Sequence, residues 1–89
     1  MPIENEFTIQ NKLGLHARSA AQLAKIANRF SCEIKVARNA EFVNGKSIMG
    51  LLTLAAAKGT KIKVICEGAD SEEAMSAIAN LINSKFGEE

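Results

Sequence analysis

Tryptophan and tyrosine are absent from this 89-residue sequence, and only four phenylalanines are present. Proteins that bind single-stranded nucleic acid stack bases on aromatic side chains, so this class is disfavoured. The sequence also lacks an excess of charge of either sign. Its 11 Lys and Arg residues nearly balance its 10 Asp and Glu residues, which leaves a net charge of +1. That balance gives no general attraction to phosphate backbones or anionic lipids. We therefore expect neither nucleic acid nor a membrane as a partner.

A basic N-terminal stretch and cysteine motifs are also missing. The first seven residues mix Glu4 and Glu6 with apolar residues, which is not the pattern of a secretory signal. We therefore predict a cytoplasmic protein without membrane insertion. The two cysteines, Cys32 and Cys66, alternate with aliphatic residues and have no CxxC or His-rich spacing around them. In a reducing compartment this pattern favours two buried thiols over a disulfide, and it indicates no metal site.

The composition that remains is that of one small globular domain. Hydrophobic residues make up 47% of the chain and charged residues 24%, which is ordinary for a folded protein. A chain of this length builds one core but has no second domain to close over a substrate. We predict a single domain over residues 1–89, with any chemistry at its surface.

Hydrophobic spacing predicts elements in the order βαββαβα. Alternation with period two predicts strands at 3–10, 32–37, around 42–43, and at 61–67. Helical spacing predicts amphipathic helices at 17–30, after Ser47 through Ala55 to a stop at Gly59, and at 70–87.

Asp70 and Glu73 have the spacing of a capping box at the start of the last helix. The strands are polar on one face and apolar on the other, which predicts an α+β fold. We expect an open-faced β-sandwich, with three helices on one face of a four-stranded antiparallel sheet.

The only histidine, His16, lies between a Gly14-Leu15 turn and the first helical stripe, so it occupies the N-cap or the first helical position. The free N–H groups there form an anion site, with the amides of Ala17 and Arg18 directed at a group carried on His16. A neutral imidazole is a competent nucleophile toward phosphorus, and the Arg18 guanidinium would contact the phosphoryl oxygens. An incidental surface histidine fits the same position, so this argument alone leaves both interpretations open.

Two segments carry a family resemblance. The sequence GLHARSA from Gly14 to Ala20 resembles the active-site motif of HPr, the phosphocarrier family of the bacterial phosphoenolpyruvate-dependent phosphotransferase system. The sequence NGKSIMGLL from Asn44 to Leu52 resembles that family's second signature. The element order is also that of the family, so the resemblance extends over the whole chain. It implies an HPr-like fold and a covalent phosphoryl-transfer intermediate rather than an enzyme, with no cofactor.

The resemblance also implies roles for particular residues. In the family, the motif histidine accepts phosphate from enzyme I through ring atom Nδ1 and passes it to a IIA domain, so this role falls on His16. The motif arginine, matched by Arg18, contacts the phosphate. The implied partners are enzyme I and the IIA proteins of sugar uptake, and we expect a monomer.

One residue departs from the family pattern, because the family usually has proline where this chain has Ser19. Proline stiffens a first helical turn. Ser19 loses that stiffness but can supply a hydroxyl and one more N–H. We expect altered transfer rates rather than lost function, or specialisation for a regulatory branch of the pathway.

Ser47 has two interpretations. As an N-cap it needs no further function. In the family it is matched to the serine that HPr kinase/phosphorylase modifies in many bacteria, and the modified form binds transcriptional regulators. The following Ile48 and Met49 resemble the context of those kinase-regulated members. The resemblance therefore favours regulatory phosphorylation at Ser47.

The short helix after Ser47 holds more apolar residues than one buried stripe requires. Some of them should therefore be exposed, as a transient docking surface needs. In the family the first and second helices contact enzyme I and the IIA proteins. We accordingly assign docking to Ile48, Met49, Leu51 and Leu52.

The alternative function is a regulatory module of a nitrogen or catabolite-control branch, acting by docking or through Ser47. Family members that only regulate lack the phosphorylatable histidine, so the presence of His16 favours the carrier. A ferredoxin-like domain that binds RNA or metal is disfavoured by the missing aromatic residues and ligand clusters. The choice between a sugar-uptake and a nitrogen-related acceptor stays open.

Overall fold

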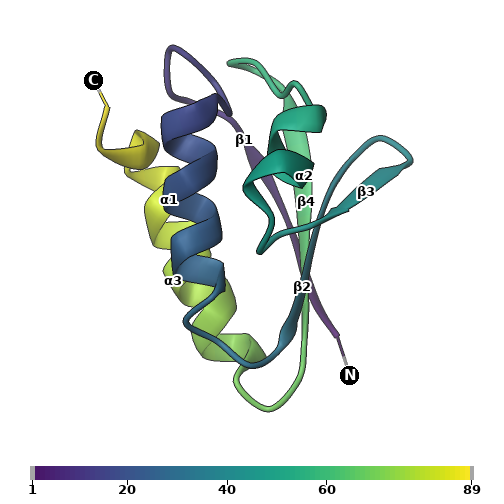
Figure 1. Cartoon of the computed structure of the whole chain (residues 1–89). Coiled ribbons are helices and arrows are strands. Elements are labelled where there is room, and N and C mark those ends of the chain that lie inside the picture. The colour runs from purple at the N-terminus through teal and green to yellow at the C-terminus, as the bar shows by residue number, and fades with distance from the viewer. Residues whose placement is uncertain (1, 89) are drawn as a thin grey trace.

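The computed structural model describes residues 2–88. In this part of the chain, strands β1 (Ile3–Thr8), β2 (Glu33–Arg38), β3 (Glu41–Asn44) and β4 (Lys61–Glu67) form one antiparallel sheet in the order β1-β4-β2-β3. Helices α1 (Ala17–Ala27), α2 (Ile48–Thr53) and α3 (Ser71–Asn83) lie on one face of the sheet, and a 3-10 turn, η1 (Lys85–Gly87), follows α3 (Figure 1). The predicted fold class and element order are confirmed.

The core lies between the sheet and the helices, because buried and exposed residues alternate along the two central strands, β2 and β4. Ile34 of β2 is opposite Cys66 of β4, and Val36 is opposite Val64, and all four are buried. The helices contribute small and aliphatic side chains from one stripe each, which are Ala20, Leu23, Ala24 and Ala27 from α1 and Ala74, Ile78 and Ile82 from α3. Both stripes lie within the amphipathic helices that helical spacing predicts.

Several predicted element ends are wrong, and the backbone gives the reasons. Helix α1 ends at Ala27 instead of residue 30, and Asn28 is its C-cap. Helix α2 stops at Thr53, because Ala55 has a left-handed φ of 50° that an α-helix does not accommodate. The last helix divides after Asn83, since Lys85 and Phe86 are also left-handed. Strand β1 ends at Thr8 instead of residue 10.

The capping box predicted at Asp70 is wrong too. Asp70 stands at the N-cap of α3 but makes no side-chain cap hydrogen bond. Its Oδ2 accepts from the N–H of Ser31 at 2.8 Å, and its Oδ1 accepts from the N–H of Cys32 at 2.9 Å. The hydrogen bond from the Ser31 backbone is the main cause that lowers the pKa of Asp70. The carboxylate therefore ties the start of α3 to the segment before β2.

Both cysteines are free and buried, as predicted. Burial and the neighbouring Cys32 raise the pKa of the Cys66 thiol to about 11. Burial and the nearby Asp70 raise the pKa of Cys32. Since the thiolate is the reactive form, both residues are unreactive core side chains in this state.

Candidate functional site

The turn before α1 determines where His16 lies. Gly14 has a left-handed φ of 69°, and a Cβ atom there would lie 2.5 Å from the carbonyl oxygen of Ala56. Only glycine fits this close approach. The next residue, Leu15, is buried and its N–H donates to the same Ala56 carbonyl at 2.8 Å. This turn is therefore fixed against the loop that follows α2, and His16 begins the helix from a rigid base.

His16 is the N-cap of α1, as expected, and its ring accepts rather than donates there. The N–H of Arg18 donates to Nδ1 of His16 at 3.4 Å, which is long for a hydrogen bond and therefore weak. The N–H groups of Ala17, Arg18 and Ser19 precede the first intrahelical bond, which Ala20 makes to the His16 carbonyl. Atom Nδ1 therefore faces the free amides and the positive end of the helix dipole.

Ser19 completes a capping box that was not foreseen. Its hydroxyl accepts from the N–H of His16 at 2.9 Å and donates to the carbonyl of Gly14 at 2.8 Å. The side chain is fully buried. Ser19 thus holds the first turn by hydrogen bonds, in the place where proline would hold it by its ring. Its hydroxyl is engaged in this turn.

A residue from the far end of the sequence completes the site. Glu88 Oε2 lies 2.7 Å from Nε2 of His16, and their side chains are 14% and 29% exposed. Glu88 Oε1 accepts from Nδ2 of Asn11 at 3.2 Å. Hydrogen bonds from His16 and Asn11 and the charge of Arg18 lower the pKa of Glu88. Sequence reasoning missed Glu88 and Asn11. Gly87 signals a left-handed helix end but not where the chain goes next.

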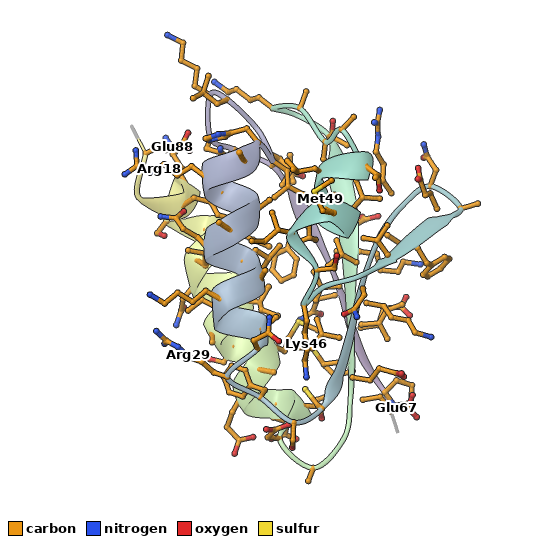
Figure 2. All side chains as sticks on the ribbon, viewed as in Figure 1. Arg18, Arg29, Lys46, Met49, Glu67 and Glu88 are labelled. Atoms are coloured by element: carbon orange, nitrogen blue, oxygen red, sulfur yellow. The ribbon has the colours of Figure 1, made fainter. Side chains whose placement is uncertain are left out.

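Arg18 lies beside this site on the exposed side of α1. Figure 2 shows Arg18 and Glu88 at the same end of the helix, and Arg29 at the other end. Among residues 2–88, none of the described hydrogen bonds or ion pairs occupies the Arg18 guanidinium. It is therefore available to a bound anion, and the sequence-predicted pair His16 and Arg18 is brought together.

The second predicted region is at the start of α2. Ser47 is its N-cap, and its hydroxyl accepts from the N–H of Gly50 at 3.0 Å. Of the four residues assigned to docking, Ile48 is 43% and Met49 72% exposed, and Figure 2 labels Met49 on α2. Leu52 is half-buried against the core.

The docking assignment is wrong for Leu51. Leu51 is fully buried, because it lies on the inner face of the short helix and belongs to the core cluster. Leu13, which is 67% exposed in the turn before α1, is an apolar surface residue that sequence reasoning missed.

Comparison with known proteins identifies the family. The family model for the PTS HPr component phosphorylation site matches residues 3–84. The phosphocarrier protein HPr of Neisseria meningitidis is 51% identical over 86 residues, covering 97% of each chain. That of Pseudomonas aeruginosa is 50% identical over 84 residues, covering 93% of each. This chain belongs to the HPr family. It is a phosphocarrier of the phosphotransferase system.

Solved HPr structures agree in fold. The HPr-C-His protein of Thermoanaerobacter tengcongensis has a TM-score of 0.95 and 47% identity, covering 98% of each chain. An HPr dimer from the same organism has a TM-score of 0.79 and 48% identity, covering 92% of this chain and 94% of that one. Crh of Bacillus subtilis, a swapped dimer, has a TM-score of 0.75 and 35% identity, with coverage of 92% and 94%. The expectation of a monomer therefore has no support from these HPr relatives.

The HPr site is an open surface rather than a pocket. A hollow of about 530 Å³ lies along β2 and the segment from Phe42 to Lys46, and His16 does not line it. Residues 2–88 hold no group of three or more His, Cys, Asp or Glu side chains suited to a metal ion. None of the helices described is both long and apolar enough to cross a bilayer. The half-buried ring of His16 lies at this open surface, which suits transfer between proteins.

Proposed function

We propose that this HPr protein accepts a phosphoryl group from phospho-enzyme I on Nδ1 of His16 and passes it to IIA proteins of sugar uptake, in the cytoplasm. The observation that carries the proposal is the direction of Nδ1, which faces the amides at the start of α1. The proposed carrier is one domain over residues 1–89, and a continuous core cluster supports this. It is a covalent intermediate, and the chemistry is completed by the donor and acceptor proteins.

The phosphoryl group would replace a weak contact. At 3.4 Å the bond from the Arg18 N–H to Nδ1 costs little to give up, and the same N–H can then donate to a phosphoryl oxygen. The Ala17 amide and the Arg18 guanidinium would add charge-assisted hydrogen bonds to the other oxygens. Transfer of this kind depends on positioning and charge stabilisation, which these groups supply.

Docking is proposed at the apolar surface formed by Leu13, Ile48, Met49 and the exposed part of Leu52. These residues flank the helix starts that hold His16 and Ser47, and an apolar patch beside charged groups suits transient partners. Ser47 is proposed as a regulatory phosphorylation site for HPr kinase/phosphorylase, with a transcriptional regulator as a further partner. Its place at a helix start, where a phosphate is electrostatically favoured, supports this.

A second function is regulation by docking alone. The likeness to Crh, which is named for catabolite repression, favours it. The presence of His16 in the N-cap position favours the carrier. A monomeric state is the simplest arrangement for sequential docking, and it stays part of the proposal.

The test mixes the purified chain with enzyme I and labelled phosphoenolpyruvate, and then adds a IIA protein. We expect label on one residue, His16, in an acid-labile and alkali-stable linkage, as a phosphoramidate has. The label should then move to the IIA protein. Label on a serine, or no label at all, would contradict the carrier function.

A further inference from the structure

The C-terminal turn, Ser84 to Glu88, places the Glu88 carboxylate beside His16. Three consecutive residues, Lys85, Phe86 and Gly87, have left-handed φ values between 55° and 76°. This conformation is unfavourable for the two non-glycine residues, but it places the Phe86 ring in the core, where it is 1% exposed. Glu88 follows directly and reaches Nε2 of His16 at 2.7 Å.

Asn11 holds the other oxygen of this carboxylate. Its Nδ2 donates to Glu88 Oε1 at 3.2 Å and to the Gly14 carbonyl at 2.7 Å, and the residue is fully buried. Rotation of the amide would place its oxygen against two acceptor oxygens, so this orientation is determined by the contacts. Both carboxylate oxygens of Glu88 are thus assigned, one to the phosphorylation site and one to the protein interior.

These contacts determine which ring nitrogen carries the proton. An ionised carboxylate only accepts, so Nε2 of His16 must donate to Glu88. The N–H of Arg18 points at Nδ1, which must therefore be the acceptor. Two contacts on opposite sides of the ring agree on one tautomer, with the hydrogen on Nε2 and the lone pair on Nδ1.

We propose that Glu88, held by Asn11, is a positioning residue for phosphoryl transfer, which keeps the ring proton on Nε2 and balances the charge that the ring gains when Nδ1 is phosphorylated. This inference rests on the proposed function, since it assumes that Nδ1 takes the phosphoryl group. Asn11 acts through Glu88 and does not contact the reacting atoms.

The transfer then needs no proton movement. The Nδ1 lone pair forms the N–P bond while the bond between phosphorus and the donor atom breaks, and the electron pair of that bond leaves with the donor. The ring becomes an imidazolium that keeps its Nε2 hydrogen, and its positive charge faces the Glu88 carboxylate. In the second transfer, a lone pair of the acceptor atom on the IIA protein forms the new bond to phosphorus while the N–P bond breaks and its electrons return to Nδ1. A neutral imidazole leaves, which is a better leaving group than the anion formed without the Nε2 proton.

The test compares Glu88→Gln, which keeps the shape but removes the charge, with Glu88→Asp and with Glu72→Gln, a change at an exposed position of α3. Each protein is phosphorylated chemically with phosphoramidate, so that no partner protein is needed. The pH midpoint for loss of the Nε2 proton from the phosphohistidine is read by ³¹P and ¹⁵N NMR. The rates of transfer from enzyme I and to a IIA protein are measured separately, together with thermal melts.

In Glu88→Gln we expect this midpoint to fall by about 0.5–1 pH unit, as loss of one close opposite charge implies. Transfer in both directions should slow about 3- to 10-fold in kcat with KM unchanged. Glu88→Asp should recover part of both effects, and Glu72→Gln should match the wild type. Asn11→Ser should shift the midpoint in the same direction as Glu88→Gln, but by less.

An unchanged midpoint in Glu88→Gln would overturn the proposal. If transfer slowed only in step with a lower melting temperature, Glu88 would be an anchor for the C-terminal turn, and the proposal would again be wrong. Failure of the wild-type chain to accept from enzyme I would instead count against the proposed function. The phosphoramidate measurements would still decide whether Glu88 holds the ring proton.

Discussion

The starts of α1 and α2 use the same local arrangement with different support. At each, an N-cap side chain accepts from a backbone N–H of the first turn, at 3.4 Å for His16 and at 3.0 Å for Ser47. The first turn of α1 has a second support, because the Ser19 hydroxyl joins the His16 N–H to the Gly14 carbonyl. At the start of α2, the Ser47 hydroxyl is the one side-chain cap described.

This difference fits the two proposed roles, which are phosphoryl transfer at His16 and regulation at Ser47. Because Ser19 supports its turn, His16 can release its cap contact and take up a group without destabilising the helix. Ser47 has no such freedom, and two exposed apolar residues follow it directly. We therefore expect a change at Ser47 to affect the neighbouring surface. The two helix starts therefore differ in the number of side chains that support the first turn, which are His16 and Ser19 at α1 and Ser47 at α2.

The largest expected difference between the two helix starts is in phosphoryl uptake. We predict that His16→Ala abolishes phosphoryl uptake from enzyme I, because it removes the ring nitrogen that faces the amides at the start of α1. Ser47→Ala should keep uptake near the wild-type rate and lose about 1 kcal/mol of stability through its cap. Labelling and thermal melts of both variants are the measurement. Uptake by His16→Ala would show that another residue carries the group.

The Arg18 guanidinium beside His16 should also affect the transfer rate. Arg18→Ala should lose a charged hydrogen bond to the phosphoryl group worth about 1.5–3 kcal/mol, which slows transfer about 10- to 150-fold. Its melting temperature should stay close to that of the wild type, since the side chain is exposed. Arg29→Ala, just beyond the C-terminal end of the same helix, is the matched control. Equal transfer rates in all three proteins would remove Arg18 from the site.

Charge at the other helix start should act on binding. Ser47→Asp adds a negative charge where the α2 dipole favours it, so the fold should be unaffected. The charge lies beside Ile48 and Met49 and should weaken docking by about 1 kcal/mol, which raises the KM for transfer from enzyme I about fivefold. Steady-state kinetics with Ser47→Ala as the neutral comparison provide the check. Unchanged kinetics would leave Ser47 as a helix cap only.

The redundancy of the first cap can be tested through its second member. Ser19→Ala removes the hydroxyl that joins His16 to Gly14 and should cost about 1 kcal/mol, or about 4–8 °C in Tm. Transfer from enzyme I should slow only slightly, because Nδ1 and Arg18 stay in place. Calorimetry and transfer kinetics on the same sample separate the two effects. A large rate loss without a change in Tm would mean that Ser19 acts on the chemistry directly.

The start of α3 offers a third case, in which the N-cap residue makes no side-chain cap. The pKa of Asp70 is lowered from its ordinary value of 3.8, chiefly by the Ser31 backbone N–H. A depressed folded-state pKa gives stability that is present above pH 3.8 and is lost as pH falls through the lowered value. Asp70→Asn should therefore flatten the acid limb of a Tm profile measured between pH 5 and pH 2. An identical limb in both proteins would contradict this small effect.

The sequence predicts most of the fold because the alternation of β2 and β4 and the stripes of α1 and α3 are determined by burial. It also predicts His16, Arg18 and Ser47, because each lies in a contiguous motif. The ends of α2 and α3 are different, since the left-handed conformations of Ala55 and Phe86 that follow them are not favoured by local propensity. The choice of Leu51 or Met49 as the exposed residue depends on how a short helix rotates on the core.

The contacts of the site were beyond sequence reasoning for a related cause. His16 and Glu88 are 72 positions apart, and Asn11 and Glu88 are 77 positions apart. Their meeting depends on where the C-terminal turn folds back. Ser19 was recognised as a departure from the family, but the direction of its hydroxyl depends on the carbonyl of Gly14 beside it.

The burial of Phe86 two residues before Glu88 has a practical consequence for handling this protein. Figure 1 shows the C-terminal end of the chain beside the start of α1, and the N-terminal end at the opposite end of the molecule. An affinity tag or a fluorescent fusion that continues the chain beyond Glu88 would therefore emerge next to His16. Such a tag would compete with visiting proteins for the same space. A tag placed before Pro2 would leave that surface clear.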